Sequence, residues 1–291
     1  MESAKGIIFM IMILEGDCLN RMKEIPDKSI NCCVTSPPYF GLRDYGHADQ
    51  IGLENSPQDF VDKLVEVFRE VRRVLRDDGT LWLNLGDTYA GSGGAGNQFG
   101  QIQNGLAIYK QKGRPKDIGL KPKDLIGIPW RVAFALQADG WYLRQDIIWH
   151  KPNPMPESVT DRCTKAHEYI FLLSKNERYY FDSNAIKEPA NGQDAANTFR
   201  NKRSVWHVNL QSYSGAHFAT FPPTLIMPCI LAGCPEGGTV LDPFGGAGTT
   251  GLVAHQNDRN AILCELNPEY CDLAYRRIQD QDPMFCEIIR K

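Results

Sequence analysis

Short apolar runs alternate with amphipathic stretches along most of this chain, a pattern that predicts strands and helices in alternation. Strands are expected over residues 7–14, 30–35, 80–85, 142–149, 168–173, 239–241 and 261–265. This alternation is typical of an α/β fold built on a mainly parallel sheet.

The clearest helix is expected between the second and third strands, where apolar residues recur at spacings of three and four. They are Phe60, Leu64, Phe68, Val71 and Leu75. Ser56-Pro57 favours an N-cap followed by a first helical position, and Asp78-Gly79 is expected to end the helix. Further helices are expected over residues 129–138, after the glycines at 245–248, and from Pro268 onward.

The apolar run at residues 7–14 is too short to span a membrane, which needs about 18 to 20 residues. Glu15-Gly16-Asp17 follows it without a small-residue cleavage site, so we interpret the run as a buried strand rather than an export signal. Met10 and Met12 within it are alternative translation starts. We expect a cytoplasmic protein with no membrane partner.

Composition narrows the class of protein without identifying it. The chain has 291 residues, 42% of them hydrophobic and 23% charged, which is ordinary for a globular protein and excludes disorder, collagen and coiled coil. We expect a single domain over residues 1–291. The net charge of −3 means that a nucleic-acid partner must be met by local basic patches. The nine cysteines form no Cys-x-x-Cys pair, which favours reduced, buried thiols over a zinc site or a disulfide framework.

Two long segments interrupt the alternation of strands and helices. Residues 86–125 begin with a run of glycines and continue, from residue 104, with six basic residues against two acidic ones. Residues 175–215 are polar and irregular, with Arg200, Lys202 and Arg203 close together. Loops of this length in a compact domain are usually either functional or disordered, and both interpretations stay open for each segment taken alone.

A glycine-rich turn lies near the C-terminus, between an expected strand and an expected helix. Gly246, Gly248 and Gly251 fit the pattern G-x-G-x-x-G, and Glu265 follows Gly246 by 19 residues. A carboxylate at that distance suits the two hydroxyls of a ribose. This pattern alone is compatible with an NAD-dependent dehydrogenase, or with a tight turn that needs glycine.

Asp242, just before the glycines, favours a different ligand. A dinucleotide places its pyrophosphate at the start of the helix, where a neighbouring carboxylate would repel it. A ligand that carries an ammonium group beside its ribose would instead be attracted to Asp242. S-adenosylmethionine has an ammonium group, a ribose and an adenine.

Ser36-Pro37-Pro38-Tyr39 follows the expected strand at 30–35 and leaves the sheet at its carboxyl edge, where open α/β sheets bind ligands. The prolines cannot donate ladder hydrogen bonds, and their rings fix φ, so the chain leaves the sheet in a stiff, extended conformation. The Ser36 hydroxyl and the Pro37 carbonyl could accept the two hydrogens of a nucleobase amine and free its lone pair. Tyr39 could stack on a base rotated out of the duplex.

Together the two motifs resemble the beta-type DNA amino-methyltransferases, in which the catalytic segment precedes the cofactor loop. Residues 15–18, 146–153, 164–168 and 217–222 resemble further segments of that family in the same order. The resemblance implies a Rossmann-like methyltransferase fold with a circularly permuted motif order. Its mainly parallel sheet would have seven strands, with an antiparallel edge strand and inserted DNA-recognition loops at 86–125 and 175–215.

The resemblance also assigns roles to individual residues. The catalytic segment would be Ser36, Pro37, Pro38 and Tyr39. The S-adenosylmethionine site would contain Asp17, Thr35, Thr220, Phe221, Asp242, Phe244, Gly246, Gly248, Thr249 and Glu265. Contacts to DNA phosphates are expected from Lys110, Lys112, Arg114, Lys151, Arg200, Lys202 and Arg203.

In this family a serine before Pro-Pro-Tyr is typical of enzymes that methylate N4 of cytosine, whereas aspartate or asparagine is typical of N6-adenine enzymes. Ser36 therefore favours cytosine, with adenine as the alternative. The expected partners are double-stranded DNA and a cognate restriction endonuclease, and no metal is expected. An RNA or protein substrate, or a relative that has lost activity, stays open.

Overall fold

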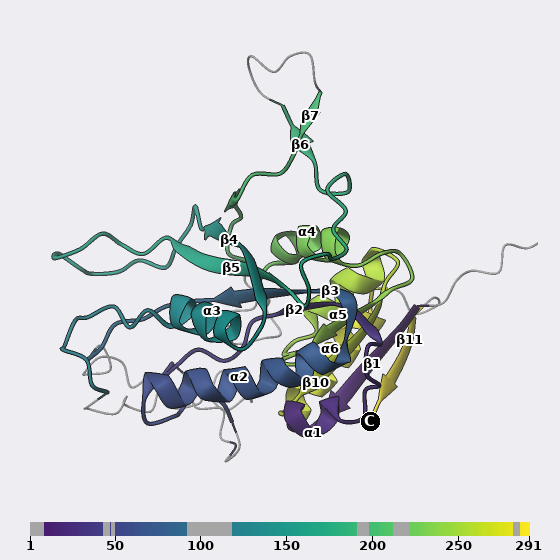
Figure 1. Cartoon of the computed structure of the whole chain (residues 1–291), viewed down its shortest axis with the longest axis horizontal. Coiled ribbons are helices and arrows are strands. Elements are labelled where there is room, and N and C mark those ends of the chain that lie inside the picture. The colour runs from purple at the N-terminus through teal and green to yellow at the C-terminus, as the bar shows by residue number, and fades with distance from the viewer. Residues whose placement is uncertain are drawn as a thin grey trace, which may run out of the picture.

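The computed structural model describes residues 9–42, 47, 50–91, 118–190, 198–211, 221–281 and 286–291. Its central element is a nine-stranded sheet with the strand order β11-β1-β10-β9-β2-β3-β5-β4-β8 (Figure 1). The strands are β1 (Phe9–Glu15), β2 (Ile30–Thr35), β3 (Leu75–Leu85), β4 (Tyr142–His150), β5 (His167–Ser174), β8 (Val205–His207), β9 (Thr239–Asp242), β10 (Asn260–Glu265) and β11 (Cys286–Arg290).

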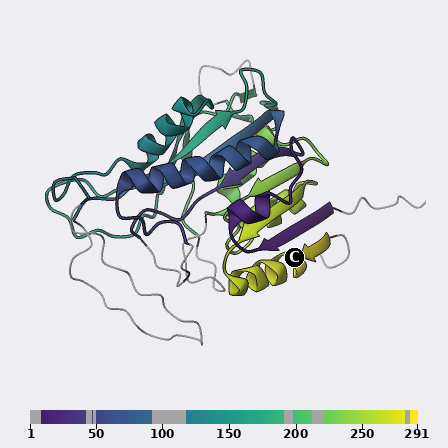
Figure 2. The ribbon, with the colours of Figure 1, turned by 60° about the horizontal axis from the view of Figure 1, so that its bottom comes forward.

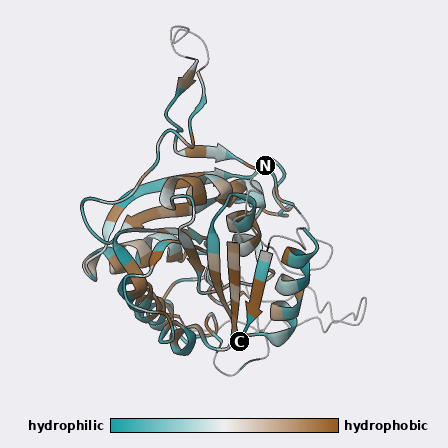
Figure 3. Ribbon diagram, turned by 90° about the vertical axis from the view of Figure 1, so that its right-hand side faces the viewer, coloured by the Kyte–Doolittle hydropathy of each residue, from teal (hydrophilic) through white to brown (hydrophobic). Residues whose placement is uncertain are grey.

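Helices cover both faces of this sheet. They are α1 (Cys18–Met22), α2 (Pro57–Val74), α3 (Ile128–Ala138), α4 (Pro223–Gly233), α5 (Thr249–Gln256) and α6 (Pro268–Gln279). The first three pack on one face, where Figure 2 shows α2 and α3 lying across the strands, and the last three pack on the other. Figure 3 shows hydrophobic residues concentrated on the strands between these two layers.

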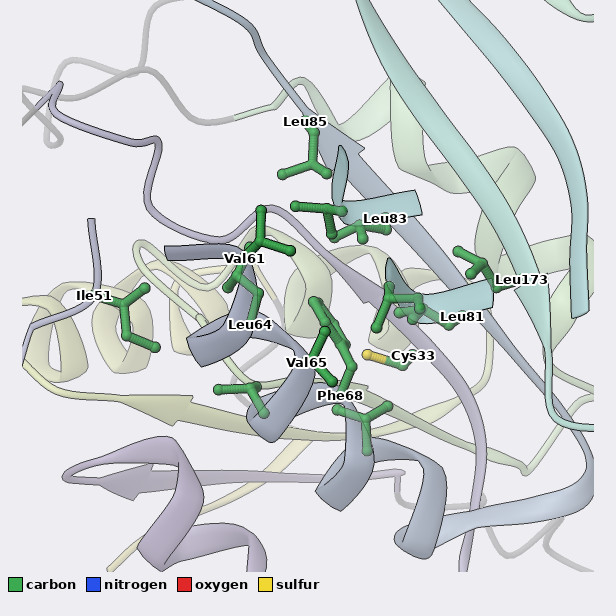
Figure 4. Close-up of a cluster of buried hydrophobic side chains, with 14 of the residues drawn as sticks. Cys33, Ile51, Val61, Leu64, Val65, Phe68, Leu81, Leu83, Leu85 and Leu173 are labelled. Atoms are coloured by element: carbon green, nitrogen blue, oxygen red, sulfur yellow. The ribbon is translucent and has the colours of Figure 1, made fainter. Parts of the chain in front are cut away.

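Helix α2 illustrates how local sequence produces this packing. The Ser56 side chain accepts a hydrogen bond from the backbone N–H of Asp59 (3.1 Å), and Pro57 occupies the first helical position, as predicted. Its apolar face is buried, and Figure 4 shows Leu64 and Phe68 pointing from the helix toward side chains of β3.

All seven predicted strands are present, but the predicted end of α2 is wrong. The helix ends at Val74, and Leu75 already adopts an extended conformation and pairs with Ile30 of β2. Asp78-Gly79 therefore lies within β3. The N–H of Leu75 still donates to the Val71 carbonyl, and its own carbonyl accepts from the Lys175 ammonium group at 2.8 Å. Its side chain is fully buried, so the extended conformation leaves no backbone group unpaired and outweighs the helical spacing of the apolar residues.

The predicted sheet of seven strands with an antiparallel edge strand also needs correction. Two short strands, β8 and β11, extend the sheet at its edges, and the pattern of apolar residues predicted neither of them. The antiparallel strand is β5, and it lies between β3 and β4 rather than at an edge. The connection through α3 does not place β4 directly beside β3. Instead β5, which runs antiparallel to both strands, lies between them.

The order of the strands creates a switch point between β2 and β9. The chain crosses from β2 toward β3 on one side, and from β9 toward β10 on the other. Cys32 and Cys33 pair in parallel with Val240 and Leu241, so both strands end at the same edge. Such a point forms a crevice at the carboxyl ends of the strands. The two sequence motifs, which follow β2 and β9, therefore meet there.

A small antiparallel hairpin projects from the body of the molecule (Figure 1). It consists of β6 (Glu188–Pro189) and β7 (Phe199–Arg200) and belongs to the predicted recognition segment at 175–215. Much of the other predicted segment, residues 92–117, lies outside the described residues.

The described residues also bear on membrane and metal partners. No helix in these ranges is long and apolar enough to cross a bilayer. No cluster of three or more His, Cys, Asp or Glu side chains that could hold a metal ion occurs in them. Among the cysteines with described side chains, all eight are free thiols and seven are buried.

Candidate active site

A cavity of about 240 Å³ opens at the carboxyl edge of the sheet. Its wall is formed by the segments that follow β1, β2, β9 and β10, and by side chains from β3, β4 and β5. All four residues of the predicted catalytic segment line it: Ser36, Pro37, Pro38 and Tyr39. Seven of the predicted cofactor residues line it too: Asp17, Phe221, Asp242, Phe244, Gly246, Thr249 and Glu265. The switch point thus brings together two motifs that are more than 200 residues apart in the chain.

Tyr39 is held in a defined orientation inside this cavity. Its hydroxyl donates to the Glu168 carboxylate at 2.6 Å and lies 3.4 Å from the Asn84 side-chain oxygen. One edge of its ring packs against Gly86, where an added Cβ would lie only 2.5 Å from Cε2 of the ring. A ring fixed at both its hydroxyl and its edge can offer a rigid stacking surface.

Asp242 lines the cavity beside the glycine loop, and groups of the protein itself bind its carboxylate. Its carboxylate is 1% exposed and accepts hydrogen bonds from the Thr35 hydroxyl (2.6 Å), the Thr250 hydroxyl (2.6 Å) and the backbone N–H of Phe244 (3.0 Å). Burial raises its pKa, and these three hydrogen bonds oppose that rise. Asp242 therefore ties the end of β2 to the start of α5. With three of its acceptor positions occupied, it has little capacity left for a ligand ammonium group.

Glu265 ends β10, and its carboxylate lies where the prediction expected a ribose-binding acid. It accepts the backbone N–H groups of Gly246 (2.7 Å) and Asn267 (2.9 Å). Burial raises the pKa of Glu265 from 4.5 to about 7. A partly buried acceptor at a cavity wall is suited to a ligand that supplies hydroxyl donors.

The glycine loop owes its shape to two residues with left-handed backbone conformations. Gly246 has a φ of 50° and lines the cavity, and Gly248 has a φ of 76° and precedes the first residue of α5. A Cβ on Gly248 would lie 2.8 Å from the Cβ of Ala274, so this glycine permits close packing of α5 against α6. Gly248 and Thr35, both predicted to bind the cofactor, do not line the cavity; they support it instead. Thr220 lies outside the described residues.

The predicted catalytic segment and the glycine loop meet at one switch point, and comparison with known proteins identifies the class of enzyme. Residues 30–276 match the N6/N4 family of DNA methylases. The chain belongs to this family. The match excludes the alternative of an NAD-dependent dehydrogenase.

Individual relatives agree with this assignment. The methylase is 54% identical to the Type II methyltransferase M.Cfr9I of Citrobacter freundii, over 93% of its own length and 88% of that protein. Its fold is similar to that of the PvuII DNA methyltransferase, described as cytosine-N4-specific, with a TM-score of 0.68, 20% identity, and coverage of 96% and 91% of the two chains. It is also similar to M1.HpyAVI, solved as a complex with SAM, with a TM-score of 0.59, 19% identity, and coverage of 92% and 99%.

The residues predicted to contact DNA lie in different places in the methylase. Arg200 and Arg203 both bond to Glu188, at 3.0 and 2.7 Å, at the hairpin and the residues that follow it. Lys202 lies over the ring of Trp206 at 5.0 Å. Lys151 lines the cavity with only 14% of its side chain exposed, so it does not lie on an open phosphate-binding surface. Lys110, Lys112 and Arg114 lie outside the described residues.

Sequence reasoning missed a polar group on the far wall of the cavity. Glu168 at the start of β5 bonds to Lys151 (2.5 Å) and Tyr39, and Asn84 of β3 donates to Glu168 at 3.2 Å. One available signal was a polar residue in an otherwise apolar strand, as at Asn84. Glu168 and Lys151 lie in segments that resembled the family, but the sequence indicated no specific role for Glu168.

Proposed function

We propose that this methylase transfers a methyl group from S-adenosylmethionine to the exocyclic N4 amine of cytosine in double-stranded DNA. The observation that carries the proposal is the single cavity lined by both Ser36–Tyr39 and the glycine loop after β9. A methyl donor held by the loop and an amine held by Ser36 would then lie next to each other, which is the geometry that direct transfer requires.

The cofactor half of the cavity has the chemistry that S-adenosylmethionine needs. Glu265 offers a partly buried carboxylate at the cavity wall to the ribose hydroxyls, which can donate hydrogen bonds to it. Phe244, Leu266 and Phe221 supply apolar surface for the adenine and for the methionine chain, and Asp17 supplies a further carboxylate. S-adenosylmethionine supplies a methyl group on a sulfonium sulfur, which is already activated for transfer.

On the other side of the cavity, Ser36 and the Pro37 carbonyl would prepare the amine. By accepting its two hydrogens they favour a pyramidal nitrogen, whose lone pair attacks the methyl carbon. The nitrogen–carbon bond forms as the sulfur–carbon bond breaks and the sulfur keeps the bonding electron pair. The nitrogen is then positively charged and loses one proton to water. Tyr39 would hold the flipped base by stacking on its face.

Cytosine is favoured over adenine by Ser36, the residue type that is typical of N4 enzymes. The similar fold of the cytosine-N4-specific PvuII enzyme is compatible with this choice. N6 of adenine is the second candidate, because the same arrangement of acceptors can serve either amine.

DNA would be read by the hairpin of β6 and β7 and by the basic segment around Lys110, Lys112 and Arg114. Arg200 and Arg203 share one carboxylate, so the pair keeps a net positive charge for a phosphate. Lys202 adds a third cation nearby. We further propose that the methylase protects the target site of a cognate restriction endonuclease.

The proposal is tested by incubating the purified protein with DNA and S-adenosylmethionine and analysing the nucleosides by mass spectrometry. N4-methylcytosine supports the proposal in full. N6-methyladenine keeps the reaction but overturns the choice of base, and the absence of any methylated base overturns the assignment.

Ser36→Ala tests the catalytic segment and is expected to abolish transfer with little change in cofactor affinity. Ser29→Ala is the matched control, because Ser29 precedes β2 at the opposite end of the strand, and within the described residues its hydroxyl bonds only to the Pro26 carbonyl. If Ser36→Ala retained activity, the assignment of Ser36 would be wrong.

A further inference from the structure

Lys151 has an unusual environment for a lysine in a DNA-binding protein. Its side chain is 14% exposed and lines the cavity that also contains Ser36 and Tyr39. Its ammonium group lies 2.5 Å from Glu168 Oε1 and 4.4 Å from the ring centroid of Trp149. A cation this far from solvent needs partners for its hydrogens.

Glu168, in contrast, is fully used by the protein. Oε1 accepts from Lys151, and Oε2 accepts from the Tyr39 hydroxyl (2.6 Å) and from the Asn84 amide (3.2 Å). Lys151 carries three N–H groups. Among the described residues Glu168 provides the only oxygen partner of the ammonium group, and the Trp149 ring covers another side of it. At least one N–H therefore has no protein acceptor in this part of the chain.

The carboxylate of Glu168 connects this ammonium group to Tyr39, because its two oxygens bind one of them each. A base that stacks on Tyr39 would consequently have its edge close to Lys151. The amino group of that base is met by acceptors at Ser36 and Pro37, whereas the acceptor nitrogen beside it in the ring needs a hydrogen-bond donor. That ring nitrogen is N3 in cytosine and N1 in adenine.

Building on the proposed function, we propose that Lys151 donates a hydrogen bond to the ring nitrogen adjacent to the amine that is methylated. Lys151 would then determine specificity as well as orientation. Guanine and thymine carry an N–H at the equivalent ring position, so a cationic donor would reject them. Glu168 acts as a positioning residue, because it holds both the ammonium group and the stacking ring.

The proposal is tested with DNA in which the target base lacks this nitrogen: 3-deazacytosine if the wild type methylates cytosine, and 1-deazaadenine if it methylates adenine. Removal of the acceptor changes the intrinsic reactivity of the amine equally for every variant. Comparison of wild type with Lys151→Met therefore isolates the hydrogen bond. We expect the deaza base to lower kcat/KM about 10- to 100-fold more in the wild type than in Lys151→Met.

Lys175→Met is the matched control. Lys175 is buried to the same degree (13% exposed) and is ion-paired with Asp77, but it follows the last residue of β5, whereas Glu168 lies at the start of that strand. It should show the full wild-type penalty with the deaza base. The double variant Lys151→Met/Glu168→Gln removes both charges, so it avoids an unpaired carboxylate and should also show little extra penalty. Lys151→Arg should recover part of the discrimination.

An equal deaza penalty in wild type and in both Lys151→Met variants would overturn the proposal, since the ring nitrogen would then be bound by another group. That outcome differs from failure of the proposed function, in which the wild type methylates neither the natural base nor its analogue.

Discussion

Gly86→Ala is the substitution that tests most directly whether a fixed Tyr39 ring matters. Gly86 follows β3 in an ordinary backbone conformation, so alanine adds no backbone strain. Its Cβ, however, would lie 2.5 Å from Cε2 and 3.1 Å from Cδ2 and Cζ of the Tyr39 ring. Carbon atoms pack at about 3.5 to 4.0 Å, so the ring would have to retreat by about 1 Å.

The retreat conflicts with the hydrogen bond between the Tyr39 hydroxyl and Glu168, which is 2.6 Å long. A hydrogen bond to a charged group contributes about 1.5–3 kcal/mol. If the aligned position of the Tyr39 ring loses this stabilisation, the rate of methyl transfer should fall about 10- to 100-fold. The strain of overpacking adds about 1–3 kcal/mol of destabilisation. Affinity for S-adenosylmethionine should change less than about twofold, which corresponds to about 0.4 kcal/mol.

The assay is single-turnover transfer of a radiolabelled methyl group to target DNA, together with urea unfolding. Tyr39→Ala removes the ring, and in that background Gly86→Ala should cost neither rate nor stability, which gives a double-mutant cycle for the contact. Wild-type transfer by Gly86→Ala alone would refute the reasoning, since the ring would then be either mobile or unnecessary.

Further outcomes are expected from charge and hydrogen bonding. The pKa of Glu265 is about 7 in the folded protein and 4.5 in the unfolded chain, so the folded protein binds the proton more tightly. The ligand-free protein should therefore lose up to about 3 kcal/mol of stability as the pH rises from 4.5 to 7. The pKa of Asp242 is raised as well, so it acts in the same direction. S-adenosylmethionine should bind more tightly from pH 6 to pH 8 by calorimetry, and a flat profile would contradict the role of Glu265. Asp242→Ala should destabilise the fold by about 3–5 kcal/mol in urea unfolding because it leaves three buried donors unpaired, whereas Asp242→Asn should cost less. Equal losses for both would argue against this hydrogen-bonding role. Arg203→Ala should lower the slope of log affinity for DNA against log salt by about 1. Arg76→Ala, at the amino end of β3, should leave that slope unchanged.

The sequence by itself determined the seven main strands, four of the six described helices and the two motifs. Ser56-Pro57 and the apolar spacing that follows define α2, because capping and helical periodicity act over a few residues. The apolar runs define the seven main strands, and Ser36 and Asp242 mark the ends of two of them. Because the motifs follow parallel strands, their position at one edge was also predictable.

Only the tertiary structure decided how the cavity works. Tyr39 meets Glu168 across 129 residues, and Thr35 meets Asp242 across 207, and no local pattern indicates either contact. Those contacts give the buried Asp242 carboxylate hydrogen-bond donors within the protein, and they bring Lys151 from an expected DNA surface into the cavity. The position of β5 between β3 and β4 produces the second change, because it brings Glu168 to the same edge as the carboxyl ends of the parallel strands. Strand order depends on how distant segments pair and pack, which the period of side chains along one strand does not encode.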